Sequence, residues 1–165
     1  METDVLEKRE RYENLLRQMR ALIVDGIPPE GNISNLLAHL KTELNLFWVG
    51  LYMRTSENAL GLGIFQGMPA CTKIDFGKGV CGTAAQHQQT IVVENVHEFP
   101  GHIACDSASN SEIVVPLIKE GELLGVLDLD SPSLARFDEG DAEGLNELVK
   151  VFMGALDSGE PSSPN

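Results

Sequence analysis

Two apolar segments separated by only three residues constrain the fold of this chain more than any other feature. They are residues 112–118, EIVVPLI, and residues 122–130, ELLGVLDLD. The connection, Lys119-Glu120-Gly121, ends in glycine, which is typical of a three-residue loop closed by a residue in the left-handed conformation. The pattern predicts an antiparallel hairpin.

The register of this hairpin determines where its acidic residues lie. With a three-residue loop, Ile118 pairs with Glu122, Glu112 lies opposite Asp128, and Asp130 follows on the same face. A two-residue loop would move Glu112 to the other face. The opposite face is then apolar and is expected to belong to the core: Ile113, Val115, Leu117, Leu123, Leu127 and Leu129.

The shared face suggests a binding function. Three carboxylates in one patch repel one another, so an apolar hairpin gains nothing from such a cluster by itself. We interpret the patch as a pocket for a cationic group. The alternative is a solvated strand edge.

Helical patterns occupy both ends of the chain. Apolar residues recur at helical spacing over residues 2–25, and Pro28-Pro29 and Gly31 are expected to end that helix. A second helix is predicted over residues 33–44. The last helix begins near Asp138, a suitable N-cap with Asp141 three residues on, and runs to about residue 156.

The segments between these helices favour strands at 46–53, 59–65 and 90–96, with a short helix at 82–88. Residues 66–80 read as a loop. Residues 97–110 show no periodicity, and structureless segments of that length are commonly functional. Strands in the middle with helices at both ends predict an α+β fold with an antiparallel sheet.

The length favours a single domain, residues 1–157, with residues 1–25 as its N-terminal helix. The tail, residues 158–165, is rich in Ser and Pro and is expected to be disordered.

The formal net charge of −13 limits the classes of partner that the protein is expected to bind. Such an acidic chain is repelled by phosphate backbones, so neither nucleic acid nor an anionic membrane is an expected partner. The charged N-terminus lacks the apolar segment of a signal peptide, and we expect a cytoplasmic protein.

Three cysteines, Cys71, Cys81 and Cys105, are an odd number, which argues against a structural disulfide framework. Zinc ligation is disfavoured because the chain has no CxxC or HxxxH spacing, although His residues at 87, 97 and 102 are available. We therefore expect no bound metal. Buried, inert thiols are the remaining structural alternative.

The surroundings of two cysteines point to reactivity. Cys81 precedes the predicted short helix, whose N-terminus would lower the pKa of its thiol. Cys105 is surrounded by small residues that leave backbone N–H donors near the sulfur. From the residues alone, the role of nucleophile is divided equally between these two.

Four motifs carry a resemblance to a known family: GxxQGxPACxxI, FGKGVCGTAA, FPGHIACDSASxSEIVVP and GVLDLDSP. Together, over residues 47–152, the chain resembles the free methionine-(R)-sulfoxide reductases, which are built on a stand-alone GAF domain. The resemblance implies a GAF-like α+β fold, with a central antiparallel sheet of about six strands flanked by the N- and C-terminal helices.

The resemblance also implies roles for the cysteines. Cys105 matches the usual nucleophile, which attacks the sulfoxide, releases methionine and becomes a sulfenic acid. Cys71 matches the resolving cysteine, which closes a disulfide with Cys105. Cys81 matches a third cysteine, which some accounts make the nucleophile, so both alternatives stay open.

The implied substrate is free L-methionine-(R)-sulfoxide. Glu112, Asp128 and Asp130 match acidic residues of the substrate site, while Trp48 and Tyr52 could form an apolar wall or belong to the sheet core. The implied reductant is thioredoxin, recycled by thioredoxin reductase and NADPH, with no bound cofactor. A homodimer is the family expectation.

Two other functions fit parts of the sequence. One is a GAF module that senses a regulatory ligand, although 165 residues leave no room for an output domain. The other is a redox sensor whose cysteines form a switch disulfide without turnover. Catalytic consumption of a sulfoxide would separate the enzyme from both.

Overall fold

The computed structural model describes residues 2–101 and 109–157. Within these residues the chain forms four α-helices, one short 3-10 helix and six strands. In chain order they are α1 (Glu2–Leu22), α2 (Pro29–Glu43), β1 (Trp48–Ser56), β2 (Ala59–Gln66), β3 (Lys73–Asp75), α3 (Gly79–His87), β4 (Ile91–Val93), η1 (Val96–Glu98), β5 (Ser111–Lys119), β6 (Glu122–Ser131) and α4 (Glu139–Asp157).

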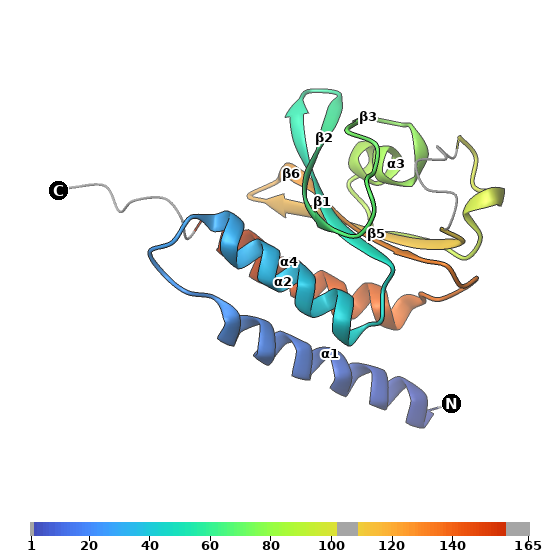
Figure 1. Cartoon of the computed structure of the whole chain (residues 1–165). Helices are drawn as coiled ribbons and strands as arrows, with labels where there is room; N and C mark the ends of the chain where they lie inside the picture. Colours follow the sequence, from blue (N-terminus) through green and yellow to red (C-terminus); the bar gives the residue numbers. More distant parts are fainter. Residues whose placement is uncertain (1, 102–108, 158–165) are drawn as a thin grey trace.

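The strands form one antiparallel sheet in the order β3-β2-β1-β6-β5-β4. Helices α2 and α4 pack on one face of the sheet, α1 lies outside them, and α3 covers the other face (Figure 1). The expected α+β architecture, with helices from both ends of the chain flanking the sheet, is confirmed. The sheet thus separates a large helical core from a smaller core under α3.

The prolines between the first two helices have a different role from the one predicted. Helix α1 ends at Leu22, and Pro29 is the first residue of α2 rather than a terminator of α1. Proline suits the first helical turn because its missing N–H would have no intrahelical partner there. The predicted start of the second helix at residue 33 is therefore four residues late.

The start of α4 confirms the predicted cap and ties α1 to the core. The Asp138 side chain accepts hydrogen bonds from the backbone N–H groups of Gly140 and Asp141, and Asp141 accepts one from the N–H of Asp138. The buried Asp141 carboxylate also accepts a hydrogen bond of 2.7 Å from the Tyr12 hydroxyl. This contact holds α1 against α4.

The hairpin of β5 and β6 has a shorter turn than predicted. Glu120 and Gly121 both have positive φ, 52° and 81°, as a two-residue turn of type I′ requires. Lys119 therefore pairs with Glu122, and Ile118 pairs with Leu123 rather than Glu122. The predicted three-residue loop is wrong.

A bulge after the turn restores the faces that the prediction assigned. The register shifts between Leu117 and Ile118. From Leu117 back to Ser111, each residue of β5 pairs with a residue of β6 one position further along than the turn alone would give. The two displacements of one residue add up to two, which is the period of side-chain alternation in a strand, so each side chain beyond the bulge keeps its predicted face. Leu123, on the turn side of the bulge, packs in the core under α3 and not on the opposite face as predicted.

The remaining differences are local. Strand β3 lies within the segment predicted as a loop, and helix α3 begins three residues earlier than predicted. The predicted disordered tail and half of the aperiodic segment, residues 102–108 with Cys105, lie outside the described residues. No helix in the described part of the chain is long and apolar enough to cross a membrane.

Candidate functional site

The three carboxylates of the hairpin lie on the face of the sheet that α3 covers. Glu112 on β5 pairs with Asp130 on β6, and Asp128 is two positions further along β6. The prediction placed Glu112 opposite Asp128, so that pairing is wrong, but all three side chains share one face. Their residues are only 8%, 5% and 9% exposed for Glu112, Asp128 and Asp130, so the cluster is not a solvated strand edge.

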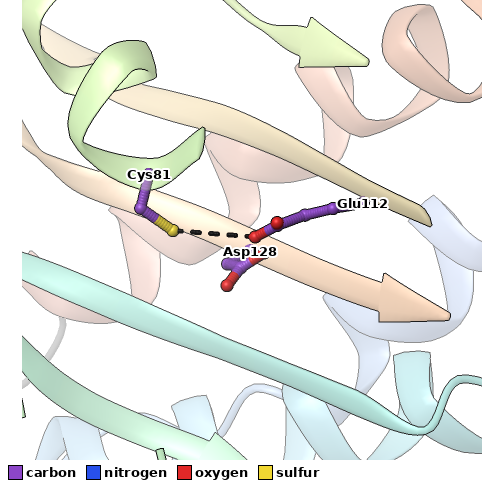
Figure 2. Close-up of side chains that lie close together, drawn as sticks. All are labelled: Cys81, Glu112 and Asp128. Atoms are coloured by element: carbon purple, nitrogen blue, oxygen red, sulfur yellow. Dashed lines mark hydrogen bonds between the residues drawn. The ribbon is translucent and has the colours of Figure 1, made fainter. Parts of the chain in front are cut away.

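Helix α3 brings a thiol to this cluster. Cys81, in the first turn of α3, points at the sheet, and its Sγ lies 3.9 Å from Oε2 of Glu112 (Figure 2). Asp128 reaches toward the same point from β6, so that three elements of the fold meet here (Figure 2). Cys81 is buried and its thiol is free.

Burial and mutual repulsion control the protonation of the cluster. Burial and the neighbouring Asp130 raise the pKa of Asp128 to about 8, and burial and Asp128 raise the pKa of Glu112 well above its ordinary value. At neutral pH the site therefore retains carboxyl protons in the absence of a cationic ligand.

The expected thiolate at Cys81 is contradicted. Burial, and then the negative charges of Asp128 and Glu112, raise the pKa of the Cys81 thiol well above its ordinary value. The N-terminus of a short helix is a smaller influence than complete desolvation beside carboxylates. Cys81 is a neutral thiol in this environment.

One oxygen of the cluster lacks a partner. Oδ1 of Asp128 is buried and accepts no hydrogen bond from any described residue. An unsatisfied buried carboxylate oxygen costs free energy, about 1–3 kcal/mol or more for a charged group. Its placement suits a ligand that donates hydrogen bonds and carries positive charge, which agrees with the interpretation of the patch as a pocket for a cationic group.

Trp48 and Tyr52 lie on the same face of β1 and are only 2% exposed each. The rings belong to the core under α3, as one of the two predicted alternatives had it, and Trp48 pairs with Asp130 of the acidic cluster across β1 and β6. The Trp48 indole N–H donates a hydrogen bond of 2.9 Å to the carbonyl of Met68, and the Tyr52 hydroxyl donates one of 3.0 Å to the carbonyl of Cys71. The two aromatic residues thus hold the loop that carries Cys71.

Of the other two cysteines, the structure describes only Cys71. Cys71 lies in the loop after β2 and is part of a disulfide bond. Cys105 lies outside the described residues. The residue that follows the undescribed segment, Ser109, is buried and donates a hydrogen bond of 3.4 Å to Oδ1 of Asp130.

Sequence reasoning missed three residues of this site: Gly50, Phe65 and Ser109. Gly50 pairs with Asp128 across β1 and β6, and Phe65 of β2 stacks on Trp48 with ring centroids 5.4 Å apart. Alternation along β1 from Trp48 to Tyr52 could have identified Gly50, since it stands between two aromatic residues on one face. Ser109 was noted in the sequence only as one of the small residues near Cys105, and nothing there indicated its hydrogen bond to Asp130.

Comparisons with known proteins agree with this geometry. The GAF domain family model matches residues 28–156. GAF domain-containing protein A of Dictyostelium discoideum is 50% identical over 145 residues, which cover 88% of this chain and 92% of the relative. Free methionine-R-sulfoxide reductase of Escherichia coli K12 is 44% identical over 147 residues, 87% of each protein.

A solved structure is also similar. The X-ray structure of free methionine-R-sulfoxide reductase from Neisseria meningitidis in complex with its substrate superposes with a TM-score of 0.85 at 44% identity, covering 90% of this chain and 89% of that one. Identity at this level, over nearly the whole chain, accompanies a buried site of acids, thiol and aromatic rings. The chain therefore belongs to the GAF domain family and, within it, to the free methionine-(R)-sulfoxide reductases.

Proposed function

We propose that this protein reduces free L-methionine-(R)-sulfoxide to L-methionine, with the acidic cluster under α3 as its substrate site. The observation that carries the proposal is the partnerless Oδ1 of buried Asp128, within a set of three acids beside a thiol. Such a site has what a small zwitterion bearing an ammonium group and a sulfoxide requires. The protein is accordingly an oxidoreductase that acts on a sulfoxide.

The acids recognise the amino group of the free amino acid. An ammonium group has three N–H donors, and Glu112, Asp128 and Asp130 present carboxylate acceptors from two adjacent strands. A peptide bond at the amino group would remove the positive charge and two of these donors. The site therefore selects free methionine sulfoxide over the same residue within a peptide.

One acid also supplies the proton that the reaction consumes. Cleaving the S–O bond of a sulfoxide requires protonation of its oxygen, and a carboxyl with a raised pKa retains a proton at neutral pH. Asp128, with a pKa of about 8, and Glu112, whose pKa is also raised, have this property. Trp48 and Tyr52 form the apolar wall for the methyl group and sulfur.

The redox steps assign one role to each of two cysteines. The Cys105 thiolate attacks the sulfoxide sulfur, the protonated oxygen is transferred to the cysteine, and methionine leaves with Cys105 as a sulfenic acid. The Cys71 thiol then attacks that sulfur, which releases water and forms a Cys71–Cys105 disulfide. The disulfide-bonded state of Cys71 and the free, neutral thiol of Cys81 support this assignment.

An external dithiol completes the cycle. Thioredoxin reduces the disulfide by exchange and is itself recycled by thioredoxin reductase and NADPH, so no cofactor resident in the protein is needed. The cytoplasm is the compartment in which this reductant operates.

A homodimer is part of the proposal. Val5 and Leu6 on α1 are 62% and 60% exposed. A groove between α1 and α4 is lined in part by Val5 and Leu16. A second copy could cover these apolar groups. Sedimentation velocity of the wild type and of the Val5→Glu, Leu6→Glu double variant tests this, since only the wild type should sediment as a dimer.

The experiment that tests the function measures NADPH oxidation with thioredoxin and thioredoxin reductase present. We expect turnover of free methionine-(R)-sulfoxide and little turnover of the S epimer, because the family prefers the R epimer. N-acetylmethionine sulfoxide is the control for the acidic site, because acetylation removes the positive charge of the amino group. Equal rates on the free and acetylated substrates would contradict the proposed role of the acids, and absence of all turnover would favour a sensor.

A further inference from the structure

The acidic site also has the composition of a metal site. Cys81, Glu112 and Asp128 each offer one ligand atom, and these three atoms lie within 4.8 Å of one another. A thiolate and two carboxylates are a donor set that Zn²⁺ accepts, with water in the fourth position. Metals that prefer oxygen alone, such as Mg²⁺, gain nothing from the sulfur.

The separations are close to those that zinc imposes. Zn–S and Zn–O bonds of about 2.3 and 2.0 Å in a tetrahedral arrangement place sulfur and oxygen about 3.5 Å apart. The Sγ of Cys81 lies 3.9 Å from Oε2 of Glu112. Side-chain movements of a few tenths of an ångström would bring the sulfur and oxygen to the separation that zinc requires, without movement of the strands or of α3.

A second observation points to a ligand at this place. Asp128 is only 5% exposed, and its Oδ1 is buried without a hydrogen-bond partner among the described residues. The three side chains converge from α3, β5 and β6 (Figure 2). A divalent cation would satisfy the open oxygen and relieve the repulsion between the two carboxylates at once.

We propose that Cys81, Glu112 and Asp128 bind Zn²⁺ in the substrate-free protein, and that this ion competes with the substrate. Zinc displaces the thiol proton to solvent, and no oxidation state changes. Because the ion occupies the carboxylates that receive the substrate's ammonium group, zinc and methionine sulfoxide exclude each other. Metal binding stands on the geometry alone, whereas its effect on turnover rests on the proposed function.

Binding is tested first, with Co²⁺ as a spectroscopic substitute for Zn²⁺. We expect one Co²⁺ per chain and the near-ultraviolet charge-transfer band of a thiolate–cobalt bond. The Cys71→Ser variant should keep the band, because Cys71 is not a ligand. In the Cys71→Ser background, Cys81→Ser should remove the band, and Asp128→Asn should weaken binding at least about tenfold.

The control separates this site from the other thiols. A reduced pair formed by Cys71 and Cys105 could also bind the ion, and Cys71→Ser removes that pair. A band that survives Cys81→Ser in this background, or one that disappears with Cys71→Ser alone, would overturn the proposal. Thermal unfolding of each variant establishes that it is folded, and addition of free methionine, the proposed product, should displace Co²⁺ from the folded protein.

The effect on turnover is measured in a single round, without thioredoxin or its reductase. Pre-reduced protein should release methionine more slowly with Zn²⁺ than with Mg²⁺, and excess substrate or a chelator should restore the rate. Inhibition that excess substrate does not relieve would overturn the competition. If the ion binds through Cys81 but no methionine is ever released, the proposed function fails while the metal site stands.

Discussion

Gly50 and Asp128 lie directly opposite each other on β1 and β6, and the missing side chain of Gly50 makes room for an aromatic ring beside the acid. A Cβ at position 50 would lie 2.6 Å from Cη2 of Trp48 and 2.5 Å from Cβ of Phe65. Real Cβ atoms do not approach others so closely. Glycine at this position therefore allows the indole to stack on Phe65 next to the acidic cluster.

The substitution Gly50→Ala should displace the Trp48 indole and break its hydrogen bond to the Met68 carbonyl. We expect kcat/KM to fall about 10- to 100-fold, because displacements of about 1 Å in a site have effects of that order. Gly154→Ala is the matched control, since a Cβ there meets nothing within 4 Å and α4 tolerates alanine. Equal activity of the two variants would show that the position of Trp48 does not matter.

The cysteines are separated by single-turnover and steady-state assays. Cys105→Ser should abolish methionine release, whereas Cys71→Ser should release one methionine per chain and then stop, because its sulfenic acid has no resolving thiol. Cys81→Ser should keep both activities in part, since a buried neutral thiol is a poor nucleophile. If Cys81→Ser loses the first round while Cys105→Ser retains it, the nucleophile is Cys81.

The hairpin illustrates how much of the site could be predicted from the sequence. Alternation of apolar and acidic residues correctly gave Glu112 and Asp128 a common face, but the turn length and the strand pairing were wrong. A two-residue turn with a bulge and a three-residue turn without one give the same faces. The bulge puts Leu123 in the smaller core on the α3 side of the sheet, which is built from segments distant in sequence, and no local pattern contains it.

Cys81 illustrates the opposite case, in which a local pattern misleads. Its position near a helix N-terminus correctly suggested a special environment, and the sign of its pKa shift was wrong. The sequence gives the helix that carries the thiol, but not the strand carboxylates that the fold places against it. The contributions of Gly50 and Ser109 are hidden for the same reason, since each acts through a contact that only the assembled sheet creates.

Tyr52 should affect the second half of the reaction more than the first. Its hydroxyl donates to the carbonyl of Cys71 and so fixes the loop of the proposed resolving cysteine, while its ring belongs to the proposed wall of the substrate site. Tyr52→Phe removes only the hydroxyl, worth about 0.5–1.5 kcal/mol. Disulfide formation should slow by roughly 2- to 10-fold with methionine release in the first round nearly unchanged. Rapid-quench measurement of both steps checks this, and an equal loss in both would contradict the anchoring role.

The raised pKa of Asp128 has a consequence for stability. The folded protein holds this proton up to about pH 8, whereas the unfolded chain releases it near pH 4. Between these values the unfolded state binds fewer protons, so the free energy of unfolding should fall as the pH rises. Asp128→Asn cannot ionise and should reduce this decline by on the order of a few kcal/mol between pH 5 and pH 8.

Urea denaturation of both proteins across that pH range measures the difference. The matched control is Asp75→Asn, the same substitution at an exposed position of β3 outside the buried cluster. Parallel curves for the wild type and Asp128→Asn would mean that the folded protein does not hold the proton.

The three acids should act as one site. A charge-assisted hydrogen bond to an ammonium group or a sulfoxide contributes roughly 1.5–3 kcal/mol, so Glu112→Gln, Asp128→Asn and Asp130→Asn should each lower kcat/KM by about 10- to 150-fold. At neutral pH each variant should unfold at nearly the wild-type temperature or above it, because removing one acid also removes repulsion within a buried cluster. Glu112 and Asp130 are directly paired and share the ligand in the proposed site, so their double variant should lose less than the product of the two single effects. Multiplicative losses in that double-mutant cycle would show that the two carboxylates act independently, and near-normal kcat/KM in all three single variants would place substrate recognition elsewhere in the molecule.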